Sequence, residues 1–359
     1  MSSTIEPKAD ADAKAAAEPK APPSNRLGLS SKEYGGLKST LCIGCGHDVI
    51  TRQITTAFYE MGVAPFKVAK MSGIGCSSKT TAYFVDRGHG FNAVHGRMPA
   101  VATGAMLANH SLITIGVSGD GDTASIGAGQ FVHLLRRNVP MIYIVENNGV
   151  YGLTKGQFSA TADEGSKSKA GVINEMPAID LCALAIELGC GYVARSFSGD
   201  MKQLLGLLKG AIAHRGTALL DVISPCVTFN NHESSTKSYK WAKDHEIPIQ
   251  EIGFVPYFEE ISVDYDPGTT QDVVMHDGSH IRLKKLRADF DPTDKNAAYE
   301  LLHESKAKNE FLTGLIYVEP TKKDFLSMLG LPEEPLVSMS LESIRPGREA
   351  LAQIMDSLR

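Results

Sequence analysis

The sequence predicts an α/β fold with a mostly parallel sheet and helices on both of its faces. Between about residues 40 and 223, short apolar runs rich in β-branched residues alternate with longer segments of helical periodicity. Strands separated by helices of this length pair in parallel through crossover connections rather than as hairpins. A hydrophobic content of 43% is enough for a sizeable core and excludes global disorder.

The expected elements follow one another in chain order. We expect strands at 66–72, 112–118, 141–145 and 218–223, and helices at 49–61, 99–109, 124–137, 178–188 and 201–214. In a sheet built this way, ligands bind at the carboxyl ends of the strands. The loops that follow the predicted strands are therefore the places to search for functional residues.

Composition divides the chain into four parts. Residues 1–25 are rich in Ala and Pro and contain no aromatic residue, so we expect a disordered tail. Residues 26–231 carry the alternating pattern. Residues 232–319 are more polar and predict an excursion with a hairpin, turning at Asp277-Gly278, and a helix near 295–310. Residues 320–359 are expected to form a C-terminal arm with one short final helix.

Charge and hydropathy exclude several classes of function. A net charge of −5 argues against nucleic-acid binding. No run of about 18 apolar residues is present, so we expect no transmembrane helix. The N-terminal residues lack the apolar segment of a secretory signal, which favours a cytoplasmic protein.

A segment with two acidic residues between glycines follows the second expected strand. It reads Gly119-Asp120-Gly121-Asp122 and opens the next helix. Glycines at such a turn let a phosphate approach closely, and the helix N-terminus favours the anion. An acidic residue beside a phosphate requires a cation between them, so Asp120 suggests Mg²⁺. The alternative is an Asp that only caps the helix.

A second element strengthens this interpretation. Asn148 lies 28 residues after Asp120, in Asn147-Asn148-Gly149, and follows the next expected strand. Together the two segments resemble the thiamine-diphosphate signature of a Gly-Asp-Gly and a paired Asn. The resemblance implies that Asp120, Asn148 and the backbone carbonyl of Val150 hold the metal. An ordinary Asn-Gly turn is the alternative.

Four of the six cysteines lie in Gly- or Pro-rich turns. They are Cys42 and Cys45, which form a Cys-x-x-Cys pair, and the separate Cys76 and Cys226. Four thiolates from such turns fit one cluster or metal ion, and a redox dithiol or a zinc site remains an alternative. Cys182 and Cys190 lie in apolar surroundings and are expected to be buried free thiols.

Several motifs in one order make the chain resemble the β subunits of the 2-oxoacid:ferredoxin oxidoreductases, and most of all the 2-oxoglutarate branch. The resemblance covers roughly residues 38–230, and Ile43 stands where the family usually has Pro. The matching motifs are Cys42-Ile-Gly-Cys-Gly-His47, Gly73-Ile-Gly-Cys76-Ser77, Val94-His95-Gly96-Arg97, Gly119-Asp-Gly-Asp122, Asn147-Asn148, Tyr151-Gly-Leu-Thr-Lys-Gly-Gln157 and Ser224-Pro-Cys226.

The resemblance implies a thiamine-diphosphate enzyme with Mg²⁺ and one [4Fe–4S] cluster. Cys42, Cys45, Cys76 and Cys226 would hold the cluster. The enzyme would decarboxylate 2-oxoglutarate, form succinyl-CoA from coenzyme A and reduce ferredoxin, or run in reverse to fix CO₂. Pyruvate or another 2-oxoacid is the alternative substrate. A non-catalytic iron–sulfur or zinc scaffold and a non-redox thiamine decarboxylase are alternatives of other classes.

The resemblance also implies partners. The carboxylate that activates thiamine normally comes from a second α/β domain. The alternating strands and helices expected in this chain are enough for only one sheet. An α subunit is therefore expected to supply the pyrimidine half of the site and much of the coenzyme A site, in a dimer of αβ heterodimers. Ferredoxin is the expected electron acceptor.

Individual residues acquire expected roles from the matching motifs. His47, His95 and Lys155 are the candidates for catalytic roles, with Lys155 placed to hold the distal carboxylate of 2-oxoglutarate. Structural histidines and a solvated lysine are the alternatives. The residues expected to bind thiamine diphosphate or its metal are Gly46, His47, Ser77, His95, Gly96, Arg97, Gly119, Asp120, Gly121, Asp122, Asn148, Val150, Gly152, Leu153 and Thr154.

Overall fold

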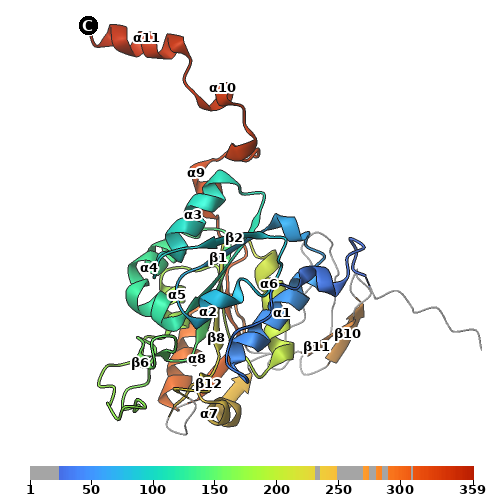
Figure 1. Cartoon of the computed structure of the whole chain (residues 1–359), viewed down its shortest axis with the longest axis vertical. Coiled ribbons are helices and arrows are strands. Elements are labelled where there is room, and N and C mark those ends of the chain that lie inside the picture. Colours follow the sequence, from blue (N-terminus) through green and yellow to red (C-terminus); the bar gives the residue numbers. More distant parts are fainter. Residues whose placement is uncertain (1–23, 231–234, 249–269, 275–279, 285–289, 309) are drawn as a thin grey trace, which may run out of the picture.

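An eight-stranded sheet forms the centre of the molecule, which confirms the predicted α/β class (Figure 1). The structure is a computed structural model, and it describes residues 24–230, 235–248, 270–274, 280–284, 290–308 and 310–359. In spatial order the strands are β2 (His89–Asn92), β1 (Val68–Ser72), β3 (Ile113–Gly119), β4 (Met141–Asn147), β8 (Thr217–Ile223), β7 (Tyr192–Phe197), β12 (Phe311–Val318) and β9 (Glu246–Pro248).

The strands from β2 to β7 are all parallel to their neighbours, as predicted. Every residue of β1, β4, β7 and β8 is buried. Strands of a parallel sheet are covered on both faces, which explains why these segments are continuous apolar runs without polar alternation. At the far edge, β12 is antiparallel to β7 and parallel to β9.

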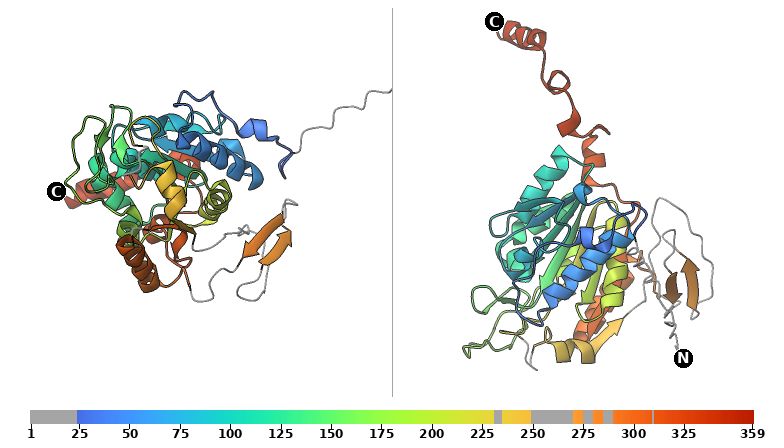
Figure 2. Two further views of the ribbon diagram at one scale, coloured as in Figure 1. Left: turned by 90° about the horizontal axis from the view of Figure 1, so that it is seen from below. Right: turned by 45° about the vertical axis from the view of Figure 1, so that its right-hand side comes forward.

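Helices cover both faces of this sheet (Figures 1 and 2). One core lies under α1 (Gly46–Glu60) and α6 (Met201–Ala213), which pack against each other. A second core lies on the opposite face. The helices that contribute to it are α3 (Met98–Ala108), α4 (Ala128–Arg137), α5 (Leu181–Glu187) and α8 (Lys295–Ala307).

Local chemistry explains where the element boundaries differ from the prediction. Helix α5 begins at Leu181 rather than at 178 because the Asp180 side chain accepts hydrogen bonds from the N–H groups of Cys182 and Ala183. Before α4, Gly121–Ile126 forms a π-helical turn, a feature common at functional sites. The short helix α2 (Cys76–Thr80) and the exposed strand β2 were not predicted, since neither is long enough to show periodicity.

The region after Cys226 returns to the main sheet. Helix α7 (Tyr239–His245) leads into β9, and the predicted hairpin is present as the antiparallel pair β10 (Thr270–Val274) and β11 (His280–Lys284). Its predicted turn at 277–278 lies outside the described residues. The expected helix near 295–310 is α8. Strand β12 corrects the prediction of an excursion that lasts to residue 319, because residues 311–318 belong to the central sheet.

The C-terminal arm extends away from the body of the molecule (Figures 1 and 2). We expected one short final helix, and the arm contains α9 (Phe325–Leu329), α10 (Leu341–Ile344) and α11 (Arg348–Ser357). The predicted disordered tail lies outside the described residues except for positions 24 and 25.

A buried arginine links the sheet to α5. Arg195 in β7 donates from Nε to Asp221 in β8 (2.9 Å) and from Nη2 to Asp180 at the start of α5 (2.7 Å). Arg195 and Asp221 are buried, so each charge depends on its partner. The arginine holds the pKa of Asp180 below its usual range despite burial, which opposes it.

In the described part of the chain, we find no helix with the length and apolar character that crossing a bilayer requires.

Candidate active site

A cleft with an empty volume of about 490 Å³ lies where the parallel strands β1, β3 and β4 end. This is the position at which a sheet of this kind binds ligands. The cleft brings together many of the residues predicted from sequence. Its lining consists of His47, Ile74, Gly75, Cys76, Ser77, His95, Gly119, Asp120, Gly121, Asp122, Glu146, Asn148, Val150, Tyr151, Gly152, Leu153 and Thr154.

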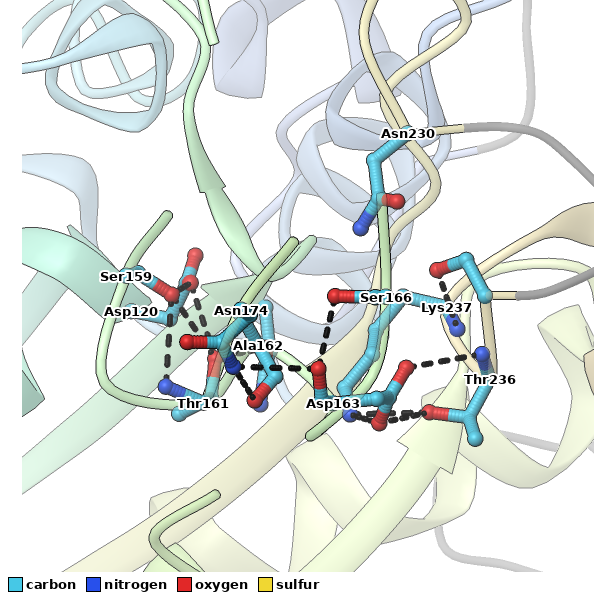
Figure 3. A network of polar contacts seen from close by, with 12 residues as sticks. Asp120, Ser159, Thr161, Ala162, Asp163, Ser166, Asn174, Asn230, Thr236 and Lys237 are labelled. Atoms are coloured by element: carbon cyan, nitrogen blue, oxygen red, sulfur yellow. Dashed lines mark hydrogen bonds and ion pairs between the residues drawn. The ribbon is translucent and has the colours of Figure 1, made fainter. Parts of the chain in front are cut away.

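Asp120 is a deeply buried carboxylate of the cleft, with 1% of its surface exposed. Its Oδ1 accepts a hydrogen bond from the Asn148 N–H (3.2 Å), and its Oδ2 accepts from the hydroxyls of Ser159 and Thr161 (2.9 Å to Thr161) (Figure 3). Burial raises the pKa of Asp120, and these hydrogen bonds oppose that shift. A nearby divalent cation would favour the ionised form, so the site fits a metal chemically.

Asn148 and Val150 lie beside Asp120, as the sequence predicted. The Oδ1 of Asn148 accepts a hydrogen bond from the Val150 N–H (3.1 Å), which fixes a tight turn. The carbonyl of Asn148 accepts from Nδ2 of Asn230 (2.7 Å). One carboxylate, one amide and one backbone carbonyl are oxygen ligands of the kind Mg²⁺ takes.

Asp122 is a second buried carboxylate that lines the cleft. It accepts hydrogen bonds from the Ser118 hydroxyl (2.7 Å) and from the Gly96 N–H (2.8 Å), and it contacts Nδ1 of His95. A Cβ at Gly73 would overlap the Asp122 carboxylate, so this position requires glycine. His95 is about one third exposed and lines the cleft.

Tyr151 is the first residue of the matching motif that ends at Gln157, and the resemblance implied no role for it. Its hydroxyl donates to the carbonyl of Gly121 (2.9 Å), and its ring occupies the space where a Gly121 side chain would lie. The ring also meets the His95 ring edge-on, with centroids 5.9 Å apart. The Tyr151 ring therefore leaves no space for a side chain at position 121.

The four turn cysteines converge at the edge of this cleft. A Cβ placed on Gly152 would lie 3.6 Å from Sγ of Cys226 and 3.8 Å from Sγ of Cys76. Thr228, two residues after Cys226, donates to Sγ of Cys42 (3.9 Å). Cys45 is the N-cap of α1, and Cys76 is the first residue of α2.

Both Cys45 and Cys76 are partly buried, which disfavours ionisation. Burial raises the pKa of the Cys45 thiol to about 12 and also raises that of Cys76. A thiolate at either position therefore depends on a metal cation, which deprotonates a coordinating thiol. In the described segments, no group of three or more His, Cys, Asp or Glu is arranged to hold a single metal ion.

Cys182 and Cys190 are fully buried, away from the cleft. Cys182 belongs to α5, and Cys190 lies two residues before β7, where its Sγ contacts the Thr217 carbonyl (3.2 Å). These positions agree with the expectation of buried free thiols.

Glu146 is a residue of the cleft that the sequence analysis missed. It is fully buried, and neither carboxylate oxygen has a hydrogen-bond partner in the described part of the chain. Its Oε2 lies 3.6 Å from Nδ1 of His47, which also meets the Ser224 hydroxyl at 2.6 Å. Burial lowers the pKa of His47 to about 4 and raises that of Glu146 well above its usual range. Burial thus disfavours the charged form of both groups rather than stabilising an ion pair between them.

Seven of the predicted residues lie outside the lining of the cleft, namely the cysteines Cys42, Cys45 and Cys226 together with Gly46, Gly96, Arg97 and Lys155. Gly46 is buried at the start of α1, where a Cβ would lie 2.6 Å from both the Ser198 and the Ser224 hydroxyl oxygens. Gly96 and Arg97 precede α3, and Gly96 contributes only its N–H to Asp122. Lys155 is exposed, directly after Thr154, and has a left-handed backbone with φ of 79°.

Comparison with known proteins adds independent evidence. Residues 73–222 match the family "Thiamine pyrophosphate enzyme, C-terminal TPP binding domain". A 2-oxoacid:ferredoxin oxidoreductase 2, subunit beta, from Aeropyrum pernix is 41% identical over 217 residues, which cover 60% of this chain and 68% of that protein. The chain belongs to this family of β subunits.

Two further relatives show how far the similarity extends. A 2-oxoacid:ferredoxin oxidoreductase subunit beta from a Sulfolobus species is 46% identical over 193 residues, which are 53% of this chain and 63% of that subunit. A solved 2-oxoglutarate:ferredoxin oxidoreductase from Magnetococcus marinus, with 2-oxoglutarate, coenzyme A and succinyl-CoA bound, aligns with a TM-score of 0.70 and 28% identity. It covers 92% of this chain and 99% of the solved chain.

We predict that Asp120→Ala abolishes retention of thiamine diphosphate, because the buried carboxylate is the only charged group among the three expected metal ligands. The change should leave the iron content nearly unaltered, since the cysteines belong to other loops. Bound thiamine can be measured by its fluorescent oxidation product and iron by colorimetry. Normal thiamine occupancy in the variant would contradict the assignment.

Proposed function

We propose that this chain is the β subunit of a 2-oxoglutarate:ferredoxin oxidoreductase. With an α subunit it would convert 2-oxoglutarate and coenzyme A to succinyl-CoA and CO₂ while reducing ferredoxin, and the same site could run in reverse. The observation that carries the proposal is the meeting of Asp120, Asn148 and Cys76 in one cleft, with the sulfur of Cys226 beside Gly152 of its lining. A scaffold protein or a simple decarboxylase would not need both the expected metal ligands and the cysteines.

In this proposal Asp120, Asn148 and the carbonyl of Val150 hold Mg²⁺ at the diphosphate of thiamine diphosphate. Gly119 and Gly121 flank Asp120 at the start of the π-helical turn, and both line the cleft in which the phosphates would lie. When bound, thiamine diphosphate would supply the carbanion-stabilising chemistry that the decarboxylation of a 2-oxoacid requires.

The remaining side chains of the cleft would bind and orient the reactants. His47 is neutral at pH 7 and can exchange hydrogen bonds without carrying charge into the cleft. His95 is oriented by Asp122 and Tyr151 and faces the cleft. Arg97 and Gly96 would act from behind the lining, by holding the loop that carries His95.

We propose that Cys42, Cys45, Cys76 and Cys226 hold one [4Fe–4S] cluster. Around one zinc ion, thiolate sulfurs lie about 3.8 Å apart, as follows from tetrahedral Zn–S bonds. In a cubane cluster each cysteine binds a different iron atom, so the sulfurs surround a larger body. The sulfurs of Cys76 and Cys226 both lie beside Gly152, and the described part of the chain contains no compact group that could hold a single ion, which fits the cluster better.

The rim of the cleft supports the expected α-subunit partner. Ile43 in the cysteine loop is 99% exposed, and Ile74 and Leu153 at the cleft are 39% and 49% exposed. Apolar side chains that surround a polar site are typical of a surface that another protein covers. An α subunit seated here would complete the pyrimidine half and the coenzyme A site, in a dimer of αβ heterodimers. We propose that the complex acts in the cytoplasm.

The substrate follows from the relatives. The solved Magnetococcus protein, which aligns over nearly its whole chain, binds 2-oxoglutarate and coenzyme A. The relatives at 46% and 41% identity are named only for 2-oxoacids, whereas relatives at 35% and 34% identity are named as subunits of a 2-oxoglutarate oxidoreductase and a 2-oxoglutarate synthase. A 2-oxoacid is therefore the coarser proposal, and 2-oxoglutarate is the finer one.

The activity can be tested on the complex of this chain with its co-purified partner. We expect ferredoxin reduction that requires both 2-oxoglutarate and coenzyme A. Omission of either should stop continued turnover, because decarboxylation provides the two electrons and coenzyme A takes the acyl group that their removal leaves. A complex that releases CO₂ without reducing ferredoxin would instead be a simple decarboxylase.

Cys226→Ser should lower the iron content and weaken the visible absorbance that dithionite bleaches. Serine removes one sulfur ligand while changing the side-chain volume little. Cys190→Ser is the matched control, since Cys190 is equally a free thiol but is buried away from the cleft. An unaltered absorbance spectrum in Cys226→Ser would show that another residue is the fourth ligand.

Lys155→Ala should reduce kcat/KM for 2-oxoglutarate by roughly 30-fold, about 2 kcal/mol in transition-state terms, if this lysine faces the distal carboxylate. Activity on 2-oxobutyrate, which lacks that carboxylate, should fall much less. Alanine rather than glycine keeps a Cβ at this left-handed position. Lys167→Ala, another exposed lysine of the same chain segment, is the control. An equal loss on both substrates would contradict the role in specificity.

A further inference from the structure

The Asp120 carboxylate is held by a segment that the family signature does not include. The antiparallel pair β5 (Val150–Tyr151) and β6 (Gln157–Phe158) turns the chain back toward the cleft. The residues that follow β6 then lie beside the Asp120 carboxylate. Ser159 and Thr161 both donate hydroxyl protons to its Oδ2, whereas Oδ1 accepts only the backbone N–H of Asn148 (Figure 3).

These contacts give the two carboxylate oxygens different surroundings. Oδ2 is enclosed by two hydroxyl donors. Oδ1 faces Asn148, and its 3.2 Å contact is longer than that from Thr161. The oxygen on the side of Asn148 is therefore the one directed toward the other proposed metal ligand. A carboxylate that rotated about its Cβ–Cγ bond would lose this arrangement.

Thr161 also reaches a second motif residue. Its Oγ1 lies 2.9 Å from Oδ1 of Asn147, and Nδ2 of Asn147 donates to Asp221 in β8 (2.9 Å). One hydroxyl therefore contacts residues from the loops after β3 and after β4. Thr161 is 2% exposed, so water does not compete for these contacts.

The contacts of Asp163 with Thr236 and Lys237, which we call the Asp163–Lys237 latch, hold the chain beside Thr161 in place. Two residues later, the Asp163 carboxylate accepts hydrogen bonds from the Thr236 N–H (3.0 Å), the Thr236 hydroxyl (2.7 Å) and Nζ of Lys237 (2.6 Å). Nδ2 of Asn174 donates to the carbonyls of Ala162 (3.1 Å) and Asp163 (3.0 Å) (Figure 3). The chain directly after Thr161 is thus held by contacts with Asn174, Thr236 and Lys237.

We propose that Thr161 is a positioning residue for the metal of thiamine diphosphate: its hydroxyl fixes the Asp120 carboxylate in the orientation that binds the cation, and the Asp163–Lys237 latch holds that hydroxyl in place. The inference rests on the proposed function, because it presumes that Asp120 is a metal ligand. Groups that orient a metal ligand typically change metal affinity about 10- to 100-fold when they are removed.

The test measures Mg²⁺ affinity on the intact complex. The complex is stripped with EDTA and supplied with saturating thiamine diphosphate, and Mg²⁺ is titrated while protein-bound thiamine is measured. Thr161→Val removes the hydroxyl at nearly constant volume and should raise the half-saturating Mg²⁺ concentration about 10-fold or more, whereas Thr161→Ser should stay within about 3-fold of the unaltered protein. Asp163→Asn should produce a smaller rise in the same direction.

Thr217→Val is the matched control. Thr217 is also a buried threonine, but its hydroxyl donates to the carbonyl of Val139 (2.7 Å), away from the cleft. This variant should lose some thermal stability and keep its Mg²⁺ affinity. Should Thr161→Val fail to fold, Asp163→Asn, which leaves Thr161 in place, still tests the latch.

Three outcomes would overturn the proposal. Unchanged Mg²⁺ affinity in Thr161→Val, with binding lost in Asp120→Ala, would leave the proposed function intact and remove the role of Thr161. Equal losses in Thr161→Val and Thr161→Ser would show that the hydroxyl is not what matters. If the unaltered complex bound no thiamine diphosphate, the proposed function and this inference would both be wrong.

Discussion

The burial of the Asp120 carboxylate is the constraint on which the arrangement of the site depends. An ionised carboxylate taken out of water is unfavourable by several kcal/mol unless hydrogen bonds or a cation compensate. The protein brings a backbone N–H and two hydroxyls to it from other segments. The N–H comes from Asn148 at the end of β4, which the parallel sheet places beside the end of β3, whereas the two hydroxyls follow the β5–β6 pair.

The same arrangement explains how much could be predicted from the sequence. The alternation of apolar runs and helical segments predicted the parallel sheet, and the order of strands then placed Asp120 and Asn148 on one edge. Cys76 and Cys226 follow buried strands for the same reason. These predictions needed only that a residue directly follow a strand whose direction was known.

Other features depended on geometry that periodicity does not record. Thr161 reaches Asp120 only because the β5–β6 pair reverses the chain, and two-residue strands leave no pattern in a sequence. Glu146 ends a fully buried strand, where an acid contradicts the expected composition, so its place in the cleft was missed. Strand β12 was missed because it follows the polar excursion and pairs in the antiparallel direction with β7, far earlier in the chain.

That last pairing has a consequence for how the chain folds. Gly314 in β12 lies opposite Arg195 in β7, the arginine that is buried between Asp221 and Asp180. Contacts between residues so distant in sequence form late, because a long loop must close first. During synthesis, β7 is an open edge until residue 318 has left the ribosome, and the arginine side of the sheet is uncovered for that time. Early encounter with a partner subunit, or with a chaperone, would protect this edge from pairing with another chain.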